Sequence, residues 1–380
     1  MAETTQTTPA SMMEGAAAPR DAYDKWLEDE KLLVYTGYYI EDTRSLELGD
    51  WARRECKAAF LRLSGQEGIS EAHVIELAPG QSLPPFRVGL DEVIYAVLGR
   101  GITTIWGNES TPKRSFEWQK HSMFFMPPNY TYQLTNTSGT EVARLLIMSS
   151  LPLALRMTPD PDFFFKNSYV NTDLLYGPGT GEYYSEAKAI RTTVKAAGRQ
   201  DTYERSIWYG SFFPDMRAWD KLDPFKGRGA GGTVVNVRFP NATTRAHMSV
   251  FPAQTYKKGH RHGPGVVIII PAGAGYSIMW AEGQEKIVIP WHESSVFVPP
   301  NRWFHQHFNV GDTSGRYLAM HPPGQWLNSE TIQNPESDQI EYPQEDPFIR
   351  NYFEEQLAKR GLMSIMPDQA YKDRNFEWDY

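Results

Sequence analysis

The sequence of 380 residues contains a single cysteine, Cys56. One cysteine cannot form a disulfide bond within the chain, so no disulfide framework supports the fold and a reducing compartment is indicated. The first residues, Met-Ala-Glu-Thr-Thr-Gln-Thr-Thr, lack the basic segment and apolar core of a secretion signal. We therefore expect a cytoplasmic protein.

Long apolar runs and basic blocks are missing as well. The longer apolar runs, such as 93–98 and 266–270, are far too short to cross a bilayer. The net charge is −8 and no block of five or six basic residues is present. A chain with this charge distribution has no electrostatic basis for binding nucleic acid or an anionic membrane. The partners that we expect are small molecules.

The composition is rich in aromatic residues, at 13%, and in turn-forming residues, with 30 Gly and 27 Pro. Many short strands joined by turns produce this balance, whereas a helical bundle does not tolerate so many helix breakers. The length suits two domains or one large duplicated domain.

The chain repeats itself at a spacing of about 174 residues. Segments 72–80, 92–101 and 126–129 align with 246–254, 266–275 and 298–301. Within each unit, short alternating or apolar runs are separated by Gly, Pro and Asn. This pattern predicts strands at regular spacing, as in a β-sandwich or a barrel.

The repeat divides the chain into five expected segments. They are an N-terminal arm at 1–35, a first unit at 36–150, a linker region at 151–235, a second unit at 236–325 and a C-terminal tail at 326–380. Helices are expected at 21–34, at 185–197 and, in the tail, at 346–360, where apolar residues recur near one face.

Four of the nine histidines occur in the second unit as two pairs with spacing i, i+2. The pairs are His260 with His262 and His305 with His307. In a β-strand, side chains at i and i+2 leave the same face, so each pair can direct two imidazoles at one point. Two such pairs on neighbouring strands would surround a divalent metal ion with nitrogen ligands.

The order of these motifs resembles that of the cupin superfamily. His-x-His is followed by Gly-x-Gly and then by Pro-x-x-x-x-His-x-x-x-Asn, which ends at Asn309. The resemblance covers both units, at roughly 70–150 and 235–325. It implies an all-β bicupin with two double-stranded β-helix (jelly-roll) barrels, a few peripheral helices and a metal ion inside a barrel mouth. This fold hosts many functions, so the motifs are specific for the fold and weak for the reaction.

The resemblance implies that His260, His262 and His305 are metal ligands. His307 is left as a substitute ligand or as a neighbour of the ligands. The glutamate ligand of the family falls on Val266 or Val267, so the carboxylate is absent.

The first unit has lost the histidines of this motif. At the matching positions it carries Phe86, Val88, Tyr132 and Leu134, and it keeps only Glu92. A lone glutamate cannot hold a metal ion, so we expect the first barrel to be metal-free and structural.

Three neutral histidines leave a divalent ion its full charge, which favours an anionic substrate and leaves coordination positions open. Imidazole ligands suit several transition metals. We expect Fe(II), with Mn, Ni, Cu or Zn as alternatives. The ligand set resembles that of the three-histidine ring-cleaving dioxygenases of gentisate, salicylate and hydroquinone type. That resemblance implies a dioxygenase that uses O2 on a small hydroxylated aromatic or related acid.

Two other functions are compatible with the same residues. One is a metal-dependent lyase, isomerase or decarboxylase acting on a small acid. The other is a bicupin that binds a small ligand without catalysis. The dioxygenases named above carry their metal in the first repeat, whereas here the histidines lie in the second. The resemblance and the aromatic C-terminus also predict a homo-oligomer, a dimer or a tetramer.

Two further residues are candidates for catalysis. His247 is an acid–base candidate, although it aligns with His73 of the metal-free unit and can equally be a barrel residue. Arg245 is in phase with His247 and is the better candidate for binding a carboxylate, whereas Arg261 is expected to point outward. The aromatic residues near the motifs are expected to be core or to line an aromatic slot: Tyr256, Tyr276, Trp280, Trp303 and Phe308. The Gly-rich stretch 227–232 is interpreted as an interdomain linker or a lid.

Overall fold

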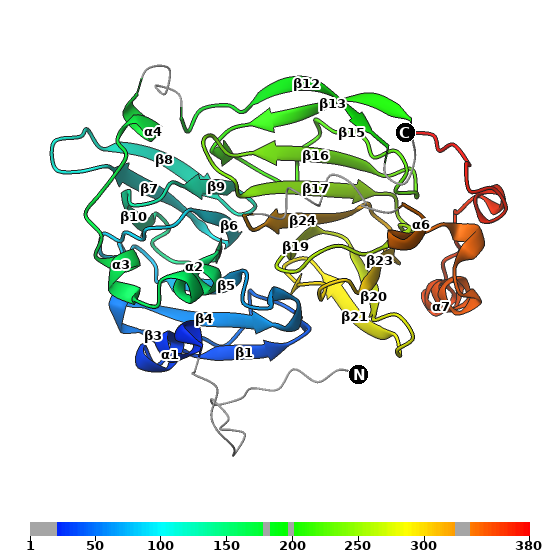
Figure 1. Cartoon of the computed structure of the whole chain (residues 1–380), viewed down its shortest axis with the longest axis horizontal. Coiled ribbons are helices and arrows are strands. Elements are labelled where there is room, and N and C mark those ends of the chain that lie inside the picture. Colours follow the sequence, from blue (N-terminus) through cyan, green and yellow to red (C-terminus); the bar gives the residue numbers. More distant parts are fainter. Residues whose placement is uncertain (1–20, 178–182, 197–200, 324–334) are drawn as a thin grey trace, which may run out of the picture.

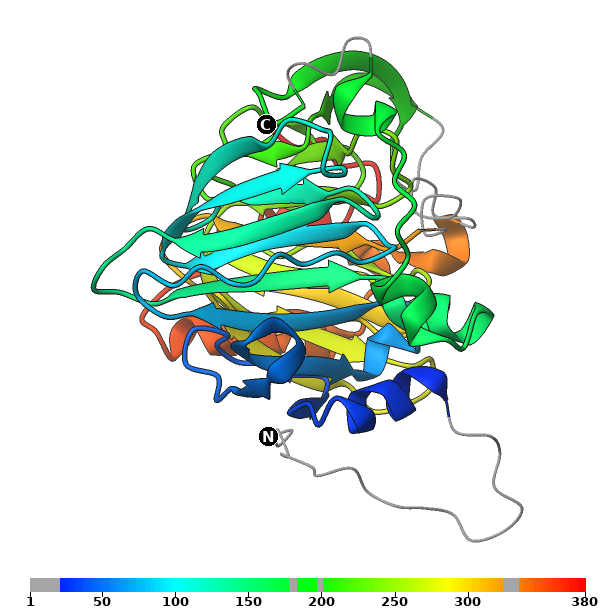
Figure 2. The ribbon, with the colours of Figure 1, turned by 90° about the vertical axis from the view of Figure 1, so that its left-hand side faces the viewer.

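The structure is a computed structural model that describes residues 21–177, 183–196, 201–323 and 335–380. Two β-barrels lie side by side, the first blue to cyan and the second green to yellow in Figure 1. Figure 2 shows the strands of the first barrel in front of those of the second.

The first barrel consists of two sheets. In the larger sheet the order is β1-β4-β5-β11-β6-β9-β14, with β3 beside β4, and in the smaller it is β10-β7-β8. Its strands are β1 (Val34–Gly37), β3 (Gly49–Trp51), β4 (Cys56–Leu63), β5 (Glu71–Leu77), β6 (Glu92–Leu98), β7 (Arg100–Trp106), β8 (Arg114–Gln119), β9 (Met123–Met126), β10 (Thr131–Asn136) and β11 (Ala143–Ser149).

The second barrel is built in the same way. Its larger sheet has the order β12-β13-β16-β17-β24-β19-β22-β2, with β15 beside β16, and its smaller sheet is β21-β20-β23-β18-β25. Its strands are β12 (Lys188–Lys195), β13 (Thr202–Tyr209), β15 (Asp223–Pro224), β16 (Thr233–Arg238), β17 (Arg245–Phe251), β18 (Gly259–His260), β19 (Val267–Ala272), β20 (Ala274–Trp280), β21 (Ile287–His292), β22 (Val296–Phe297), β23 (Phe304–Asn309), β24 (Gly315–His321) and β25 (Gln339–Ile340).

The two barrels share one strand path. The run β4-β5-β11-β6-β9 recurs as β16-β17-β24-β19-β22, and β10-β7-β8 recurs as β23-β20-β21. The pairing register follows the sequence repeat, since Tyr132 lies opposite Ile105 and His305 lies opposite Met279. The predicted fold class, two double-stranded β-helix barrels with few helices, is therefore confirmed.

Each barrel lends a short strand to the other. Strand β2 (Tyr39–Ile40), from the N-terminal part of the chain, pairs with β22, and β14 (Phe212–Phe213) pairs with β9. The outer face of the large second sheet, for example Val237 and Met248, belongs to the same apolar core as the first barrel. The two barrels are thus joined by pairing and by a common core.

Helices cover the periphery. Helix α1 (Ala22–Asp29) lies within the expected range 21–34 and is capped by the side chain of Asp21. Helix α7 (Pro347–Ala358) confirms the expected helix in the tail; it begins after the cap Asp346, and Figure 1 places it on the side of the second barrel away from the first. The others are short: α2 (Leu151–Met157), α3 (Pro161–Phe165), α4 (Asp173–Tyr176), α6 (Pro335–Asp338) and the 3-10 turns Ala52–Arg54, Ser64–Gln66, Tyr342–Gln344 and Asp368–Tyr371. Within the described ranges no helix combines the length and the apolar composition needed to cross a membrane.

The helix expected at 185–197 is wrong. Residues Lys188–Lys195 form strand β12, which pairs along its whole length with β13. The β-branched residues Ile190, Thr192, Thr193 and Val194 favour the extended backbone, and a partner strand is available. The stretch 151–235, expected as a linker region, therefore supplies helices α2–α4 and outer strands of the second large sheet.

Candidate metal centre

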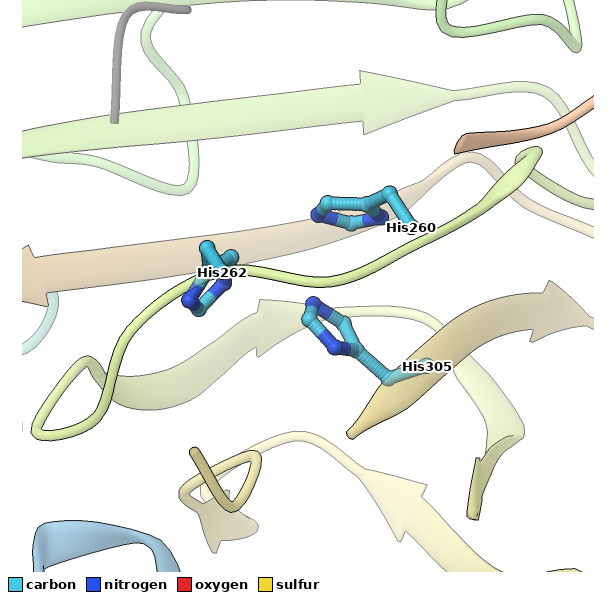
Figure 3. Close-up of side chains that lie close together, drawn as sticks. All are labelled: His260, His262 and His305. Atoms are coloured by element: carbon cyan, nitrogen blue, oxygen red, sulfur yellow. The ribbon is translucent and has the colours of Figure 1, made fainter. Parts of the chain in front are cut away.

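Three histidine side chains converge in the second barrel. His260 ends β18 and pairs in register with His305 on β23, while His262 follows two residues after His260. Figure 3 shows the three rings turned toward one another. One ring nitrogen from each lies within 4.8 Å of those of the other two. This spacing lets one divalent ion reach all three nitrogens.

Hydrogen bonds fix which nitrogen is available on two of these rings. Nδ1 of His262 lies 2.7 Å from the carbonyl oxygen of Gly263, and Nδ1 of His305 lies 3.2 Å from that of Trp303. A carbonyl oxygen only accepts, so Nδ1 carries the hydrogen in both rings and the lone pair sits on Nε2. Backbone contacts of this kind orient metal-binding imidazoles in proteins.

His260 differs from the other two, because its Nδ1 is buried and has no hydrogen-bond partner among the described residues. A buried polar atom without a partner is costly in a folded protein unless a ligand or water satisfies it. The three rings together form an all-nitrogen donor set that fits a divalent transition metal.

The surroundings keep these imidazoles neutral, which is the form that binds metal. Burial lowers the pKa of all three, that of His262 to about 4 and those of His260 and His305 well below the ordinary value. The positive charge of Arg228 acts in the same direction on each of them.

His307 lies beside this group and has a different partner. Its ring centroid is 5.6 Å from that of His305, and its Nδ1 is 2.8 Å from the hydroxyl oxygen of Ser277. Its ring also contacts Tyr317, with 4.5 Å between centroids. The structure thus brings together His260, His262 and His305, and places His307 next to them.

No carboxylate joins the three histidines in the part of the chain that the structure describes. Val266, at the position expected for the missing glutamate, is buried in an apolar cluster with Ile268 and Ile270. In the first barrel, Glu92 accepts a hydrogen bond of 2.6 Å from the hydroxyl of Tyr132. The first barrel therefore carries its own buried carboxyl group where the second has a valine.

The two residues predicted for catalysis, His247 and Arg245, both lie on strand β17 of the large sheet. Nδ1 of His247 is 2.8 Å from Nε2 of His321, so one ring donates and the other accepts. Arg245 lies opposite His321 in the register and is 3% exposed. Burial, then the charge of Arg245 and then His262, lower the pKa of His247. The pairing of His247 with His321, at the end of β24, was not predicted from the sequence.

Two other arginines near the motif, Arg261 and Arg302, form ion pairs with acidic side chains of the protein. Nε of Arg261 lies 3.0 Å from Asp338 and its Nη1 lies 2.9 Å from Glu282, which agrees with the expected outward direction. Arg302 also binds Asp338, at 3.1 Å. Neither is placed to bind a substrate carboxylate.

The aromatic residues near the motifs are core residues. Tyr256, Tyr276, Trp280 and Phe308 belong to the cluster that includes Phe353 of α7, and Trp303 packs against Tyr38. The aromatic slot is therefore the wrong interpretation for them. The rings near the histidines are instead those of Phe225 and Tyr317, which contact His247 with 6.3 and 6.1 Å between centroids.

The sequence interpretation missed two buried cations near the histidines, Arg228 and Lys257, which are 4% and 1% exposed. Arg228 lies in the Gly-rich stretch 227–232, interpreted above as a linker or lid. The repeat offered a signal, because the residue about 174 positions earlier is Arg54, which is also buried.

Two equivalent barrels with one strand path give this chain the fold of a bicupin, with a three-histidine cluster in its second barrel. Neither a protein-family model nor a curated protein matches the sequence.

Several solved structures resemble the chain at low sequence identity. One is a Lactobacillus farciminis oxalate decarboxylase in complex with formate, 11% identical over 80% of this chain and 88% of that chain, with a TM-score of 0.47. Another is a Bacillus subtilis oxalate decarboxylase with Mn(II) centres, 13% identical over 75% and 77%, with a TM-score of 0.44. A third is a Momordica charantia 7S globulin, 13% identical over 74% and 83%, with a TM-score of 0.45. Likeness at this level assigns neither activity nor metal to this chain, and these three lend no support to ring cleavage.

Proposed function

We propose that this protein is a metal-dependent enzyme that acts on a small organic acid, with a divalent ion held by His260, His262 and His305. The observation that carries the proposal is the convergence of three neutral imidazoles, one buried and two half-buried, of which two are oriented through Nδ1 by backbone carbonyls. The first barrel supports it, because Phe86 and Tyr132 stand at the positions of His260 and His305 and are paired in the same way. The fold therefore does not require histidine there.

The charges around the site favour an anionic substrate. Three neutral ligands leave the charge of a divalent ion uncompensated, and Arg228 and Lys257 add positive charge nearby. A carboxylate about 4 Å from one unit charge gains roughly 4 kcal/mol at the effective dielectric constant of protein sites. This attraction exceeds thermal energy several-fold, so a carboxylate would be preferred over a neutral ligand.

For the reaction we propose lyase, isomerase or decarboxylase chemistry. A bound divalent ion acts as a Lewis acid toward a carbonyl or carboxylate oxygen. The chain would relay protons through the His247–His321 pair, because burial keeps both rings neutral and one ring donates a hydrogen bond to the other. Apolar residues of the barrel interior, such as Ile268, Met279 and Phe297, exclude water from around the site.

The test combines metal content with turnover. Protein freed of metal is reloaded separately with Mn, Fe, Ni, Cu or Zn and offered a panel of small hydroxy, keto and dicarboxylic acids, with products followed by NMR. We expect one ion per chain and turnover without O2. His260→Ala should lose both, whereas His292→Ala, a matched change outside the cluster, should keep both. Full metal occupancy in His260→Ala contradicts the proposal.

A second candidate is the Fe(II) dioxygenase acting on a hydroxylated aromatic acid. The observations that favour it are the donor set without a carboxylate and the rings of Phe225 and Tyr317 beside His247. Oxygen uptake by the iron-loaded protein with gentisate, salicylate, catechol or hydroquinone distinguishes the two. Uptake coupled to product formation selects the dioxygenase, and turnover of an acid under nitrogen selects the first proposal.

A further inference from the structure

We propose that Lys257 and Arg228 form a subsite that binds a carboxylate of the substrate inside the second barrel. Only one part of this inference rests on the proposed function, namely that the bound carboxylate belongs to the substrate. Its capacity to bind a small carboxylate is a separate property that can be measured with or without metal.

Lys257 is a buried basic side chain without a counter-ion among the described residues. Its backbone N–H donates to the carbonyl oxygen of His307 at 3.0 Å, which ties this residue to the strand that carries His305. Its Nζ lies 4.8 Å from the ring centroid of Phe225 and 5.9 Å from that of Phe251. In the described ranges, Nζ has no hydrogen-bond partner and no carboxylate within 4.0 Å. The two rings offset only part of the cost of burying an ammonium group.

Arg228 brings a second positive charge to the same place. Its guanidinium carbon lies 5.9 Å from the centroid of the Phe225 ring that Lys257 also contacts. Its Nη1 donates to the neutral amide oxygen of Gln339 at 2.9 Å. Burial lowers the pKa of Lys257, and Arg228 lowers it further. Two buried basic groups disfavour each other's charged form, and an anion bound between them would favour the charged form of both.

The first barrel shows that the fold does not require a lysine. At the repeat spacing of about 174 residues, Lys257 corresponds to Leu83, which is fully buried. The backbone N–H of Leu83 donates to Leu134 at 2.9 Å, just as that of Lys257 donates to His307. An apolar side chain thus fits this barrel position, and the lysine serves a purpose other than packing.

The charges of the two barrels lead to the same conclusion. In the first barrel, Arg54 lies over the Phe86 ring at 4.0 Å, and its charge lowers the pKa of Glu92, which burial raises. The arginine there has an internal carboxylate nearby. In the second barrel Val266 stands at the position of Glu92, and Lys257 adds a second basic side chain at the position of Leu83. A carboxylate ligand would supply the anion that this position lacks.

The experiment measures binding of acetate, malonate and succinate by calorimetry to metal-loaded and metal-free protein. We expect binding to the natural sequence, and at least tenfold weaker binding to Lys257→Leu. The metal content of Lys257→Leu should equal that of the natural sequence. Its melting temperature without ligand should be equal or higher, whereas removal of a lysine needed only for packing would lower the melting temperature. Lys257→Met serves if the leucine variant does not fold. Lys226→Leu, which removes the same charge at an exposed position, should bind like the natural sequence.

The outcomes separate the two proposals. Equal affinity in Lys257→Leu and the natural sequence, or no binding of any of the three acids to the natural sequence, overturns the subsite. Weaker binding of the acids to Lys257→Leu supports the subsite. Measured in metal-free protein, this result supports the subsite even if the protein binds no metal. Failure to bind any metal overturns the proposed function alone.

Discussion

At the scale of single residues, the two barrels act as a natural substitution experiment on one backbone. Tyr132 and His305 occupy equivalent register positions, as do Phe86 and His260. The backbone path is shared, so chemistry depends on which side chains stand at a few interior positions. The first barrel holds an internal arginine and glutamate, and the second holds histidines together with the buried basic residues Arg228 and Lys257.

Removing Arg54 tests the internal charges of the first barrel. Arg54→Met leaves Glu92 buried without the cation that lowers its pKa, and we expect a loss of about 3–5 kcal/mol in the free energy of unfolding. The double variant Arg54→Met, Glu92→Gln should recover a large part of this loss. Denaturant unfolding measures both, and a double variant no more stable than the single one contradicts the account.

Replacing His247 tests its proposed role in proton transfer. His247→Gln should keep the metal and lower turnover by roughly 10²- to 10⁴-fold, the usual contribution of an acid–base group. The measurements are metal content and the rate with the acid found to be a substrate. Unchanged turnover would show that His247 serves the barrel structure, as its alignment with His73 allows.

At the scale of elements, the C-terminal segment covers the outer face of the sheet that carries His305. Glu345 accepts a hydrogen bond from Tyr256 and lies 3.3 Å from the amide of Gln306, between the two histidines of β23. Side chains of α7, including Phe353, pack on the same face. The aromatic residues that looked like candidates for a substrate slot are needed for this packing. Their direction could not be read from the sequence, because it depends on where α7 docks.

Glu345 gives this contact a pH dependence. Burial raises its pKa from 4.5 to about 7. A carboxyl group with a raised pKa in the folded state stabilises the fold at low pH, and this contribution is lost as the pH rises from about 4.5 to about 7. Glu345→Gln should therefore gain stability over the natural sequence across that window, by up to about 3 kcal/mol. Chemical unfolding at pH 5 and pH 8 measures the difference, and a difference that does not change with pH contradicts the assignment.

At the scale of the whole molecule, the sequence predicted the duplication and the histidine pairs, because both are periodic or local patterns. It did not predict strand β12. A helix was expected there from the local sequence, whereas pairing with β13 determines the extended conformation. It also missed Arg228 and Lys257, since burial of a cation depends on the closing of the barrel around it. The exchange of β2 and β14 between barrels has no local signature either.

The shared core and the exchanged strands predict that both barrels unfold together. Tryptophan fluorescence and far-ultraviolet circular dichroism should give one coincident denaturation curve, and a saturating metal ion should shift that whole curve upward. At a thousandfold excess of metal over its Kd, the gain is about 4 kcal/mol. Two separate transitions, only one of them sensitive to metal, would contradict coupling of the barrels.

The central claim is that His260, His262 and His305 hold one divalent ion. X-ray absorption of the zinc-loaded protein tests it most directly, because it counts imidazole ligands. We predict three imidazole nitrogens at about 2.0–2.1 Å with the remaining positions filled by oxygen, and two imidazoles in His305→Ala. One imidazole or none in the natural sequence, or the same count in His305→Ala, would contradict the account.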